Sequence, residues 1–185
     1  MVQYAIVVDL GRFVGCDGCI VACKQENDVR LGSYWMWVYQ VGPTGNFPDV
    51  SMHWLPRPCM HCKNPPCLNV CPTKAIYKRA DGIVLIDHEK CIGCRYCVWA
   101  CPYGSMQFNP DTGIVEKCIL CSQRIDKGEK PACVDSCPGR ALTFGDIDDP
   151  ASEASKLIGT KQGFVLLPDI GAEPAVHYLP PGRKL

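Results

Sequence analysis

The spacing of its cysteines constrains this chain more than any other feature. Fifteen of the 185 residues are cysteines, and most are separated by only two or three other residues. They form four groups: Cys16, Cys19 and Cys23; Cys59, Cys62, Cys67 and Cys71; Cys91, Cys94, Cys97 and Cys101; and Cys118, Cys121, Cys133 and Cys137. Together with 17 glycines and 16 prolines, this count indicates a loop-rich fold of one domain or two small ones.

The third group has the most specific motif. Its sequence, CIGCRYCVWACP, matches without a gap the bacterial run CxxCxxCxxxCP, in which three thiolates hold one iron–sulfur cluster and the fourth cysteine reaches a neighbouring cluster. Disulfide bonds are disfavoured, because many cysteines are two residues apart and their total is odd. Structural zinc needs only paired CxxC units, so the third cysteine and the xxxC arm of each group would be superfluous. Four groups therefore predict four clusters.

An internal duplication explains the odd number of cysteines. A shift of 78 residues superimposes the first group on the third, and the second and fourth groups share CxxC, a later proline and xxxCP. The superimposed pairs of the first type are Cys16–Cys94, Cys19–Cys97 and Cys23–Cys101. Under the same shift Phe13 takes the position of Cys91. One cluster therefore has only three cysteine ligands.

Charge and hydropathy disfavour several other functions. Nineteen basic residues balance nineteen acidic ones, which argues against a nucleic-acid partner or an electrostatic membrane patch. No apolar run approaches the eighteen or so residues of a spanning helix, so no direct membrane insertion is expected. The N-terminal segment has no export signal, so we expect a cytoplasmic chain, or one exported while bound to a signal-bearing partner. Without HExxH, GxGxxG or a nucleophile elbow, no catalytic residue is expected in this chain.

Four charged residues and one histidine lie near the cysteines in sequence and are candidates for influencing the clusters. His61, inside CMHC, could donate a hydrogen bond to a cluster sulfur or could simply pack. Four cations flank cysteines and could either offset the negative charge of clusters or be solvated. These are Lys24, Lys63, Lys90 and Arg95.

Local patterns predict a few short elements. Residues 35–41 alternate as a strand with an aromatic face, which packs on the core or meets a partner. Residues 80–87 are predicted to form a hairpin strand that leads into the third group, and residues 2–9 are the corresponding strand of the other repeat. A helix is expected after Asp149, and a proline-rich, extended segment follows it, either docked or disordered.

Several segments together resemble a known family over residues 3–150: CxxCxxxCKQEN, PCMHCKNPPCLNVCPTKAIYKRADGIVLID, CIGCRYCVWACPYG and KCILC…CVDSCP. They are similar to the iron–sulfur (beta) subunits of molybdopterin oxidoreductases related to dimethyl sulfoxide reductase, including polysulfide, thiosulfate and arsenate reductases and a transhydroxylase. The resemblance implies an α+β fold of two pseudo-symmetric, ferredoxin-like, two-cluster lobes with an extended C-terminal tail. Residues 1–50 plus 104–150 would form one lobe, residues 51–103 an inserted lobe, and residues 151–185 a helix and docking tail.

The resemblance also implies which cysteines share a cluster. Set A is Cys59, Cys62, Cys67 and Cys101; set B is Cys71, Cys91, Cys94 and Cys97; set C is Cys23, Cys118, Cys121 and Cys133; and set D is Cys16, Cys19 and Cys137. Phe13 stands where the family usually has the fourth ligand of set D, and Asp17 is the nearest carboxylate that could substitute. We expect three 4Fe-4S clusters and a fourth that is 3Fe-4S or an unusually ligated 4Fe-4S cluster; loss of this cluster is the third outcome.

The function implied is electron transfer without substrate conversion. The chain would relay single electrons between a large molybdopterin-binding catalytic subunit, containing molybdenum or tungsten, and an external donor, an external acceptor or a membrane subunit. The alternative is a free-standing polyferredoxin, or a relay subunit of a hydrogenase or another dehydrogenase. Association with a large pterin-binding chain would distinguish the two.

Overall fold

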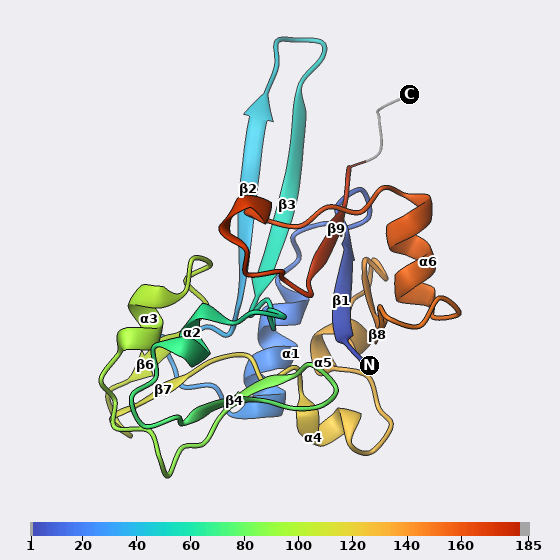
Figure 1. The fold of residues 1–185 in the computed structure, drawn as a ribbon. Coiled ribbons are helices and arrows are strands. Elements are labelled where there is room, and N and C mark those ends of the chain that lie inside the picture. The colour runs from blue at the N-terminus through green and yellow to red at the C-terminus, as the bar shows by residue number, and fades with distance from the viewer. Residues whose placement is uncertain (1, 182–185) are drawn as a thin grey trace.

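Short elements joined by long loops make up the fold (Figure 1). The computed structural model describes residues 2–181, which contain four small sheets and several short helices. The elements are β1 (Tyr4–Asp9), α1 (Gly18–Asn27), β2 (Met36–Thr44), β3 (Ser51–Pro58), α2 (Pro66–Asn69), β4 (Ile76–Lys78), β5 (Val84–Ile86), α3 (Tyr96–Ala100), β6 (Gln107–Asn109), β7 (Ile114–Glu116), α4 (Ser122–Ile125), α5 (Ala132–Asp135), β8 (Leu142–Asp146), α6 (Glu153–Thr160), the 3-10 helix η1 (Pro168–Ile170) and β9 (His177–Leu179). The mixed, loop-rich class is therefore confirmed. Within residues 2–181, none of the helices combines the length and the hydropathy needed to cross a membrane.

β1 is the central strand of the three-stranded sheet, whose order is β8-β1-β9. It pairs antiparallel with β8 and parallel with β9. Successive side chains of a strand point to opposite faces, and here both faces are buried. Val7 packs with Ala154 of α6, whereas Ile6 and Val8 belong to an apolar cluster that also contains Cys19. β1 thus joins the C-terminal helix to the cysteine loops.

The local predictions for these segments are confirmed. β1 lies within residues 2–9, β5 within residues 80–87, and β2 covers most of residues 35–41. The helix expected after Asp149 is α6, which begins where the Ser152 hydroxyl accepts a hydrogen bond from the Ser155 N–H at 3.1 Å.

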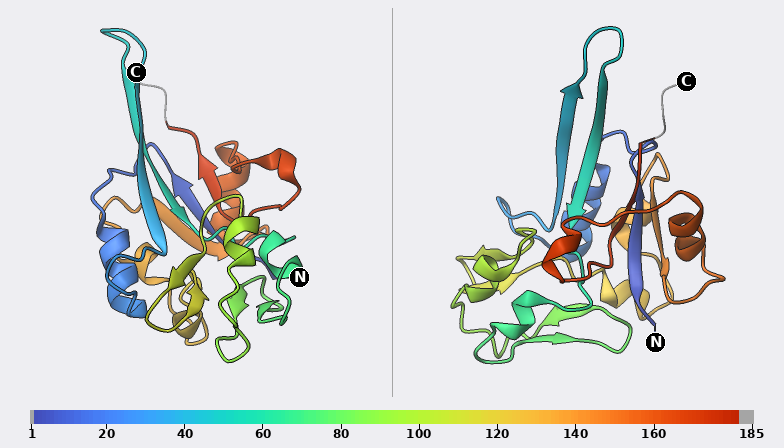
Figure 2. Two further views of the ribbon diagram at one scale, coloured as in Figure 1. Left: turned by 90° about the vertical axis from the view of Figure 1, so that its left-hand side faces the viewer. Right: turned by 45° about the horizontal axis from the view of Figure 1, so that its top comes forward.

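β2 and β3 form a long hairpin that projects from the rest of the molecule (Figures 1 and 2). Its base is buried at Trp35 and Met36, but Tyr39 is partly exposed and Phe47, in the turn region, is 93% exposed. The Arg57 guanidinium lies over the Tyr39 ring at 4.5 Å from its centroid. The aromatic face therefore packs on the core only at the base of the hairpin.

The internal duplication extends to the backbone. Gly15 and Gly93, which correspond under the 78-residue shift, both have a φ of 66°. The next corresponding pair, Asp17 and Arg95, are the left-handed N-cap residues of α1 and α3. The β4–β5 pair likewise corresponds in register to the β8–β1 pair. Ile76 pairs with Ile86 in the first of these sheets, as Leu142 pairs with Val8 in the second. The N–H of Asp87 donates to the Ala75 carbonyl at 2.8 Å, and the N–H of Asp9 donates to the Ala141 carbonyl at the same distance.

The β6–β7 hairpin packs with the central part of the chain. Met106 and Val115, which flank and belong to this hairpin, share an apolar cluster with Cys67 and Cys97. The β6–β7 hairpin thus packs against residues of the predicted inserted lobe, while Asp111 in its turn pairs with Arg30 of the other predicted lobe. The division into lobes stays a prediction.

The C-terminal segment docks on its own chain. β9 adds to the edge of β1, and Tyr178 within it is fully buried with its hydroxyl donating to the Pro56 carbonyl at 2.9 Å. Upstream, backbone N–H groups of Lys63 and Asn64 donate to carbonyls of the tail at 2.8 and 3.1 Å. The tail therefore covers the loop of the second cysteine group. Residues 182–185 of the predicted tail lie outside the described residues.

We expect Tyr178→Ala to lower the free energy of unfolding of the cluster-loaded chain by about 3–5 kcal/mol, because it removes a fully buried ring. Tyr178→Phe removes only the hydrogen bond to Pro56 and should cost about 1–3 kcal/mol. Anaerobic denaturant titration measures both values. Two near-zero effects would mean that the tail does not contribute to the folded body.

Candidate iron-sulfur sites

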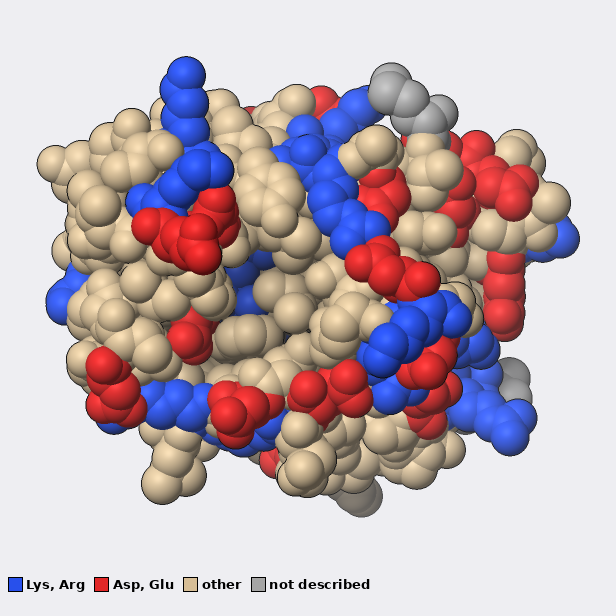
Figure 3. Space-filling model, turned by 90° about the horizontal axis from the view of Figure 1, so that it is seen from below, with Lys and Arg blue, Asp and Glu red and all other residues tan. Residues whose placement is uncertain are grey.

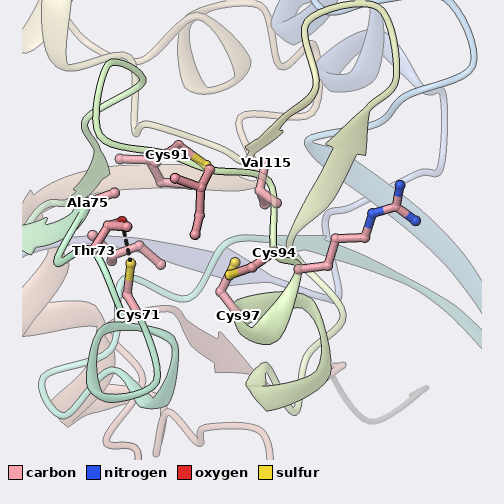
Figure 4. A pocket seen from close by; sticks show the side chains of 11 residues that line it. Cys71, Thr73, Ala75, Cys91, Cys94, Cys97 and Val115 are labelled. Atoms are coloured by element: carbon pink, nitrogen blue, oxygen red, sulfur yellow. Dashed lines mark hydrogen bonds between the residues drawn. The ribbon is translucent and has the colours of Figure 1, made fainter.

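The four cysteines of set B line one cavity (Figure 4). Cys91 and Cys94 come from the loop before α3, Cys97 from α3 itself, and Cys71 from the loop after α2. Burial, followed by the nearby Cys91 and Cys94 thiols, raises the pKa of Cys97 to about 11. The backbone of this loop is tight: a Cβ atom on Gly93 would lie 2.1 Å from the Gly113 carbonyl oxygen.

Cys71 differs from the other members of its set because donors surround its sulfur. Burial acts to raise its pKa, but the backbone of Ile76, the Thr73 hydroxyl and the backbone of Ala75 together bring the pKa of Cys71 below its usual value. The Thr73 oxygen lies 3.7 Å from the Cys71 sulfur, the contact drawn in Figure 4. The thiolate form is thus favoured at this position.

The four cysteines of set A line a second cavity. Its other walls are mostly apolar and include Val84, Met106 and Tyr103. Burial, followed by the neighbouring Cys59, raises the pKa values of Cys62 and Cys67 to about 12. A buried thiol of this kind ionises readily only when a metal binds the sulfur.

Set C combines α1 with the fourth cysteine group. Burial and then Cys121 raise the pKa of Cys23 to about 12, and burial and then Cys23 raise the pKa of Cys118. The Asn27 amide lies between the two segments: its Nδ2 is 3.9 Å from the Cys23 sulfur and 3.7 Å from the Cys121 sulfur. Sequence reasoning missed Asn27, although its place one turn after Cys23 on α1 was a usable signal.

Set D contains Cys16, Cys19 and Cys137. Burial is the main cause that raises the pKa of Cys19 to about 12, and the Cys137 and Cys16 thiols add to it. Phe13 is buried in the apolar cluster that contains Cys19. Asp17 is exposed and, as the N-cap of α1, makes no side-chain capping bond.

The cations that flank the cysteines mostly have partners elsewhere. Lys24 Nζ donates to the carbonyls of Arg30 and Ser33 at 3.0 and 2.6 Å, although its charge also slightly lowers the pKa of Cys23. Three others engage acidic or aromatic groups, namely Lys63 with Glu173, Lys90 with Asp87, and Arg95 over the Phe108 ring. Acidic and basic side chains are likewise interspersed on the lower face of the molecule (Figure 3).

Sequence reasoning missed Lys117, although its position directly before Cys118 could have drawn attention to it. It is 1% exposed, and its Nζ donates to the carbonyls of Val84 and Cys118. His61 is also 1% exposed; its Nδ1 accepts the Val84 N–H at 3.0 Å, which places the ring proton on Nε2. Burial and then the positive charge of Lys117 hold the pKa of His61 well below its usual value, so the ring is neutral.

Cysteines from separate segments thus surround shared cavities, which is the donor chemistry of iron–sulfur clusters. Among residues 2–181, no group of three or more His, Cys, Asp or Glu side chains has the arrangement that holds a single metal ion. A fold of small sheets and cysteine loops with such cavities defines the class of ferredoxin-like iron–sulfur proteins.

Comparison with known proteins agrees with this class. Residues 50–147 match the family model of the 4Fe-4S dicluster domain. The chain is 42% identical to the B subunit of a sulfite dehydrogenase from Allochromatium vinosum, over 97% of this chain and 84% of the relative. It is 43% identical to the B subunit of a tetrathionate reductase from Salmonella typhimurium, over 96% of this chain and 72% of the relative. It is 35% identical to the arsenate respiratory reductase iron-sulfur subunit of a Shewanella species, over 96% of each chain.

The chain therefore belongs to the 4Fe-4S dicluster family, and within it to the iron–sulfur B subunits of oxidoreductases of the dimethyl sulfoxide reductase type. This confirms the predicted family. It also confirms the role of the chain as an iron–sulfur electron-transfer subunit.

We expect Gly93→Ala to lower the iron content of the purified protein by the equivalent of one cluster, because the new methyl group would collide with the Gly113 carbonyl. Gly113→Ala is the matched control: its φ is also positive, but a Cβ there meets nothing within 4 Å. Iron analysis of both variants checks this. Equal iron in the two proteins would contradict the expectation.

Proposed function

We propose that the chain binds four iron–sulfur clusters through sets A to D and passes single electrons between a molybdopterin-containing catalytic subunit and a second redox partner. The main support is the pairing of cysteines from distant groups around common cavities, as in set B, where Cys71 joins Cys91, Cys94 and Cys97. When bound, such clusters supply one-electron oxidation and reduction over a wide range of potentials. The chain supplies ligands, hydrogen bonds and an environment that excludes water.

Two packed helix pairs would connect neighbouring clusters. α2 supplies Cys67 to set A and leads to Cys71 of set B, while α3 supplies Cys97 to set B and leads to Cys101 of set A. α1 carries Cys19 of set D and Cys23 of set C, while α5 supplies Cys133 to set C and leads to Cys137 of set D. The two helices of each pair pack together. This correspondence supports two pseudo-symmetric lobes, each holding two clusters.

The contact between lobes would be made by sets A and C. Cys59 of set A and Cys118 of set C belong to the same apolar cluster, and Cys59 contributes, after burial and Cys23, to the raised pKa of Cys118. The proposed relay therefore runs D–C–A–B. Cys16 of set D and Cys94 of set B are exposed, which leaves the two ends of the relay accessible to partners.

The proposed catalytic partner rests on the relatives. Those named above are B subunits or iron-sulfur subunits of a dehydrogenase and of two reductases, and such subunits work beside a chain that converts the substrate. We propose a large subunit with molybdopterin at one end of the relay. A membrane subunit or another redox protein would serve the other end.

Serine variants test the shared ligand sets. Cys67→Ser and Cys101→Ser should perturb the same cluster, because both cysteines line the set A cavity. Cys97→Ser should perturb a different cluster, although Cys97 is much nearer to Cys101 in sequence. Iron analysis, with about fifteen or sixteen irons expected per wild-type chain, and electron paramagnetic resonance (EPR) of reduced samples measure this. A common signal lost in Cys97→Ser and Cys101→Ser would refute the proposed sets.

Phe13→Cys tests the three-cysteine site. We expect the wild-type protein to contain a 3Fe-4S or an unusually ligated 4Fe-4S cluster in set D, and Phe13→Cys to convert it to an ordinary cubane. EPR of oxidised samples and retention of iron after mild oxidation report the change. Val14→Cys, at the exposed neighbouring residue, is the control and should change neither. Four ordinary all-cysteine cubanes in the wild-type protein would contradict the proposal.

A further inference from the structure

Lys117 is a fully buried cation without an acidic partner. No carboxylate among residues 2–181 forms an ion pair with its Nζ, which instead donates to the backbone carbonyls of Val84 and Cys118. Burying an ammonium group without nearby negative charge is costly. The adjacent His61 is neutral and offers no negative charge. The groups that remain are the cysteine sulfurs.

The position of Lys117 places its charge between sets A and C. It precedes Cys118 of set C, and the strand residue whose carbonyl it binds, Val84, lines the set A cavity. The charge also reaches a ligand of set A, since it lowers the pKa of Cys67 against the dominant effects of burial and Cys59. The ammonium group therefore lies against the backbone of Cys118 in set C and acts on Cys67 in set A.

The internal repeat shows that the loop itself does not require this charge. Shifting the second group onto the fourth, Cys59 onto Cys118, places Pro58 on Lys117 and His61 on Leu120. Pro58 and Leu120 are both buried. An apolar residue thus fills each corresponding position, and the polar pair occurs once, with Lys117 from the fourth cysteine group and His61 from the second.

We propose that Lys117 sets the reduction potentials of the two central clusters, those of sets A and C, by holding a positive charge between them. The inference rests on the proposed function, from which the two sets come. A cluster held by four thiolates is negatively charged, and reduction adds one further electron with no bond broken. A buried cation favours the reduced form and raises the potential. The electron comes from the neighbouring cluster in the relay.

Lys90 is a matched control. It stands directly before Cys91, as Lys117 stands before Cys118, but its side chain is 63% exposed and pairs with Asp87 at 2.7 Å. Solvent and the paired carboxylate screen its charge. Removal of this charge should therefore leave the potentials nearly unchanged.

The test is a redox titration, followed by EPR, of the full-length chain with its clusters, purified without oxygen. In Lys117→Met, two of the four reduction potentials should become more negative. The equilibrium constant of each of these one-electron steps should change at least tenfold, which corresponds to about 59 mV. Lys90→Met should change the equilibrium constant of every reduction step less than twofold. Lys117→Arg, which keeps the charge, should restore the wild-type steps.

Three results would overturn the proposal. The first is a Lys117→Met protein with full iron content and unchanged potentials, and the second is an equal shift of all four steps. The third is loss of iron in both Lys117→Met and Lys117→Gln with retention in Lys117→Arg, which would make the residue structural. A wild-type protein with fewer than four clusters would instead refute the proposed function, and iron analysis detects this separately.

Discussion

Burial of cysteine thiols is the constraint on which the rest of this structure depends. Apolar surroundings raise the pKa of such a thiol, to about 12 at Cys19 and Cys67, so a bound metal has to stabilise the thiolate. Cysteines are also members of both larger apolar clusters. Several residues of the core are therefore also residues of the sites. Helices and strands stay short because the chain returns to a cavity every few residues.

The backbone is repeated, but the electrostatics are not. The β4–β5 and β8–β1 pairs share their register, and α1 and α3 begin with the same left-handed residue. Where the loops of the second and fourth cysteine groups meet, however, each loop has one polar residue where the other has an apolar one: Lys117 corresponds to Pro58, and His61 corresponds to Leu120. The two loops have thus diverged at these two positions, and each contributes one residue to a single polar pair. In a chain of similar sites, such a difference distinguishes the sites from one another.

Features set by local sequence could be predicted, and those set by tertiary burial could not. The elements β1, β5 and α6 all follow from spacing, alternation or repetition within short segments. The burial of Lys117 could not be read in this way, because its exposure depends on β5, more than thirty residues away. Lys63 and Lys90 also flank cysteines, yet they are exposed and paired with acids. The docking of Tyr178 against Pro56 likewise joins segments over a hundred residues apart.

The pairing of β1 has a consequence for the synthesis of the protein. β1 precedes both of its partners, β8 and β9, by more than a hundred residues, so it is synthesised well before them. Until they are made, an apolar strand with two unpaired edges is exposed, a form that invites aggregation. Pairing with β8 and β9 therefore completes the protection of this strand, and a product truncated before β9 leaves one edge of β1 unpaired.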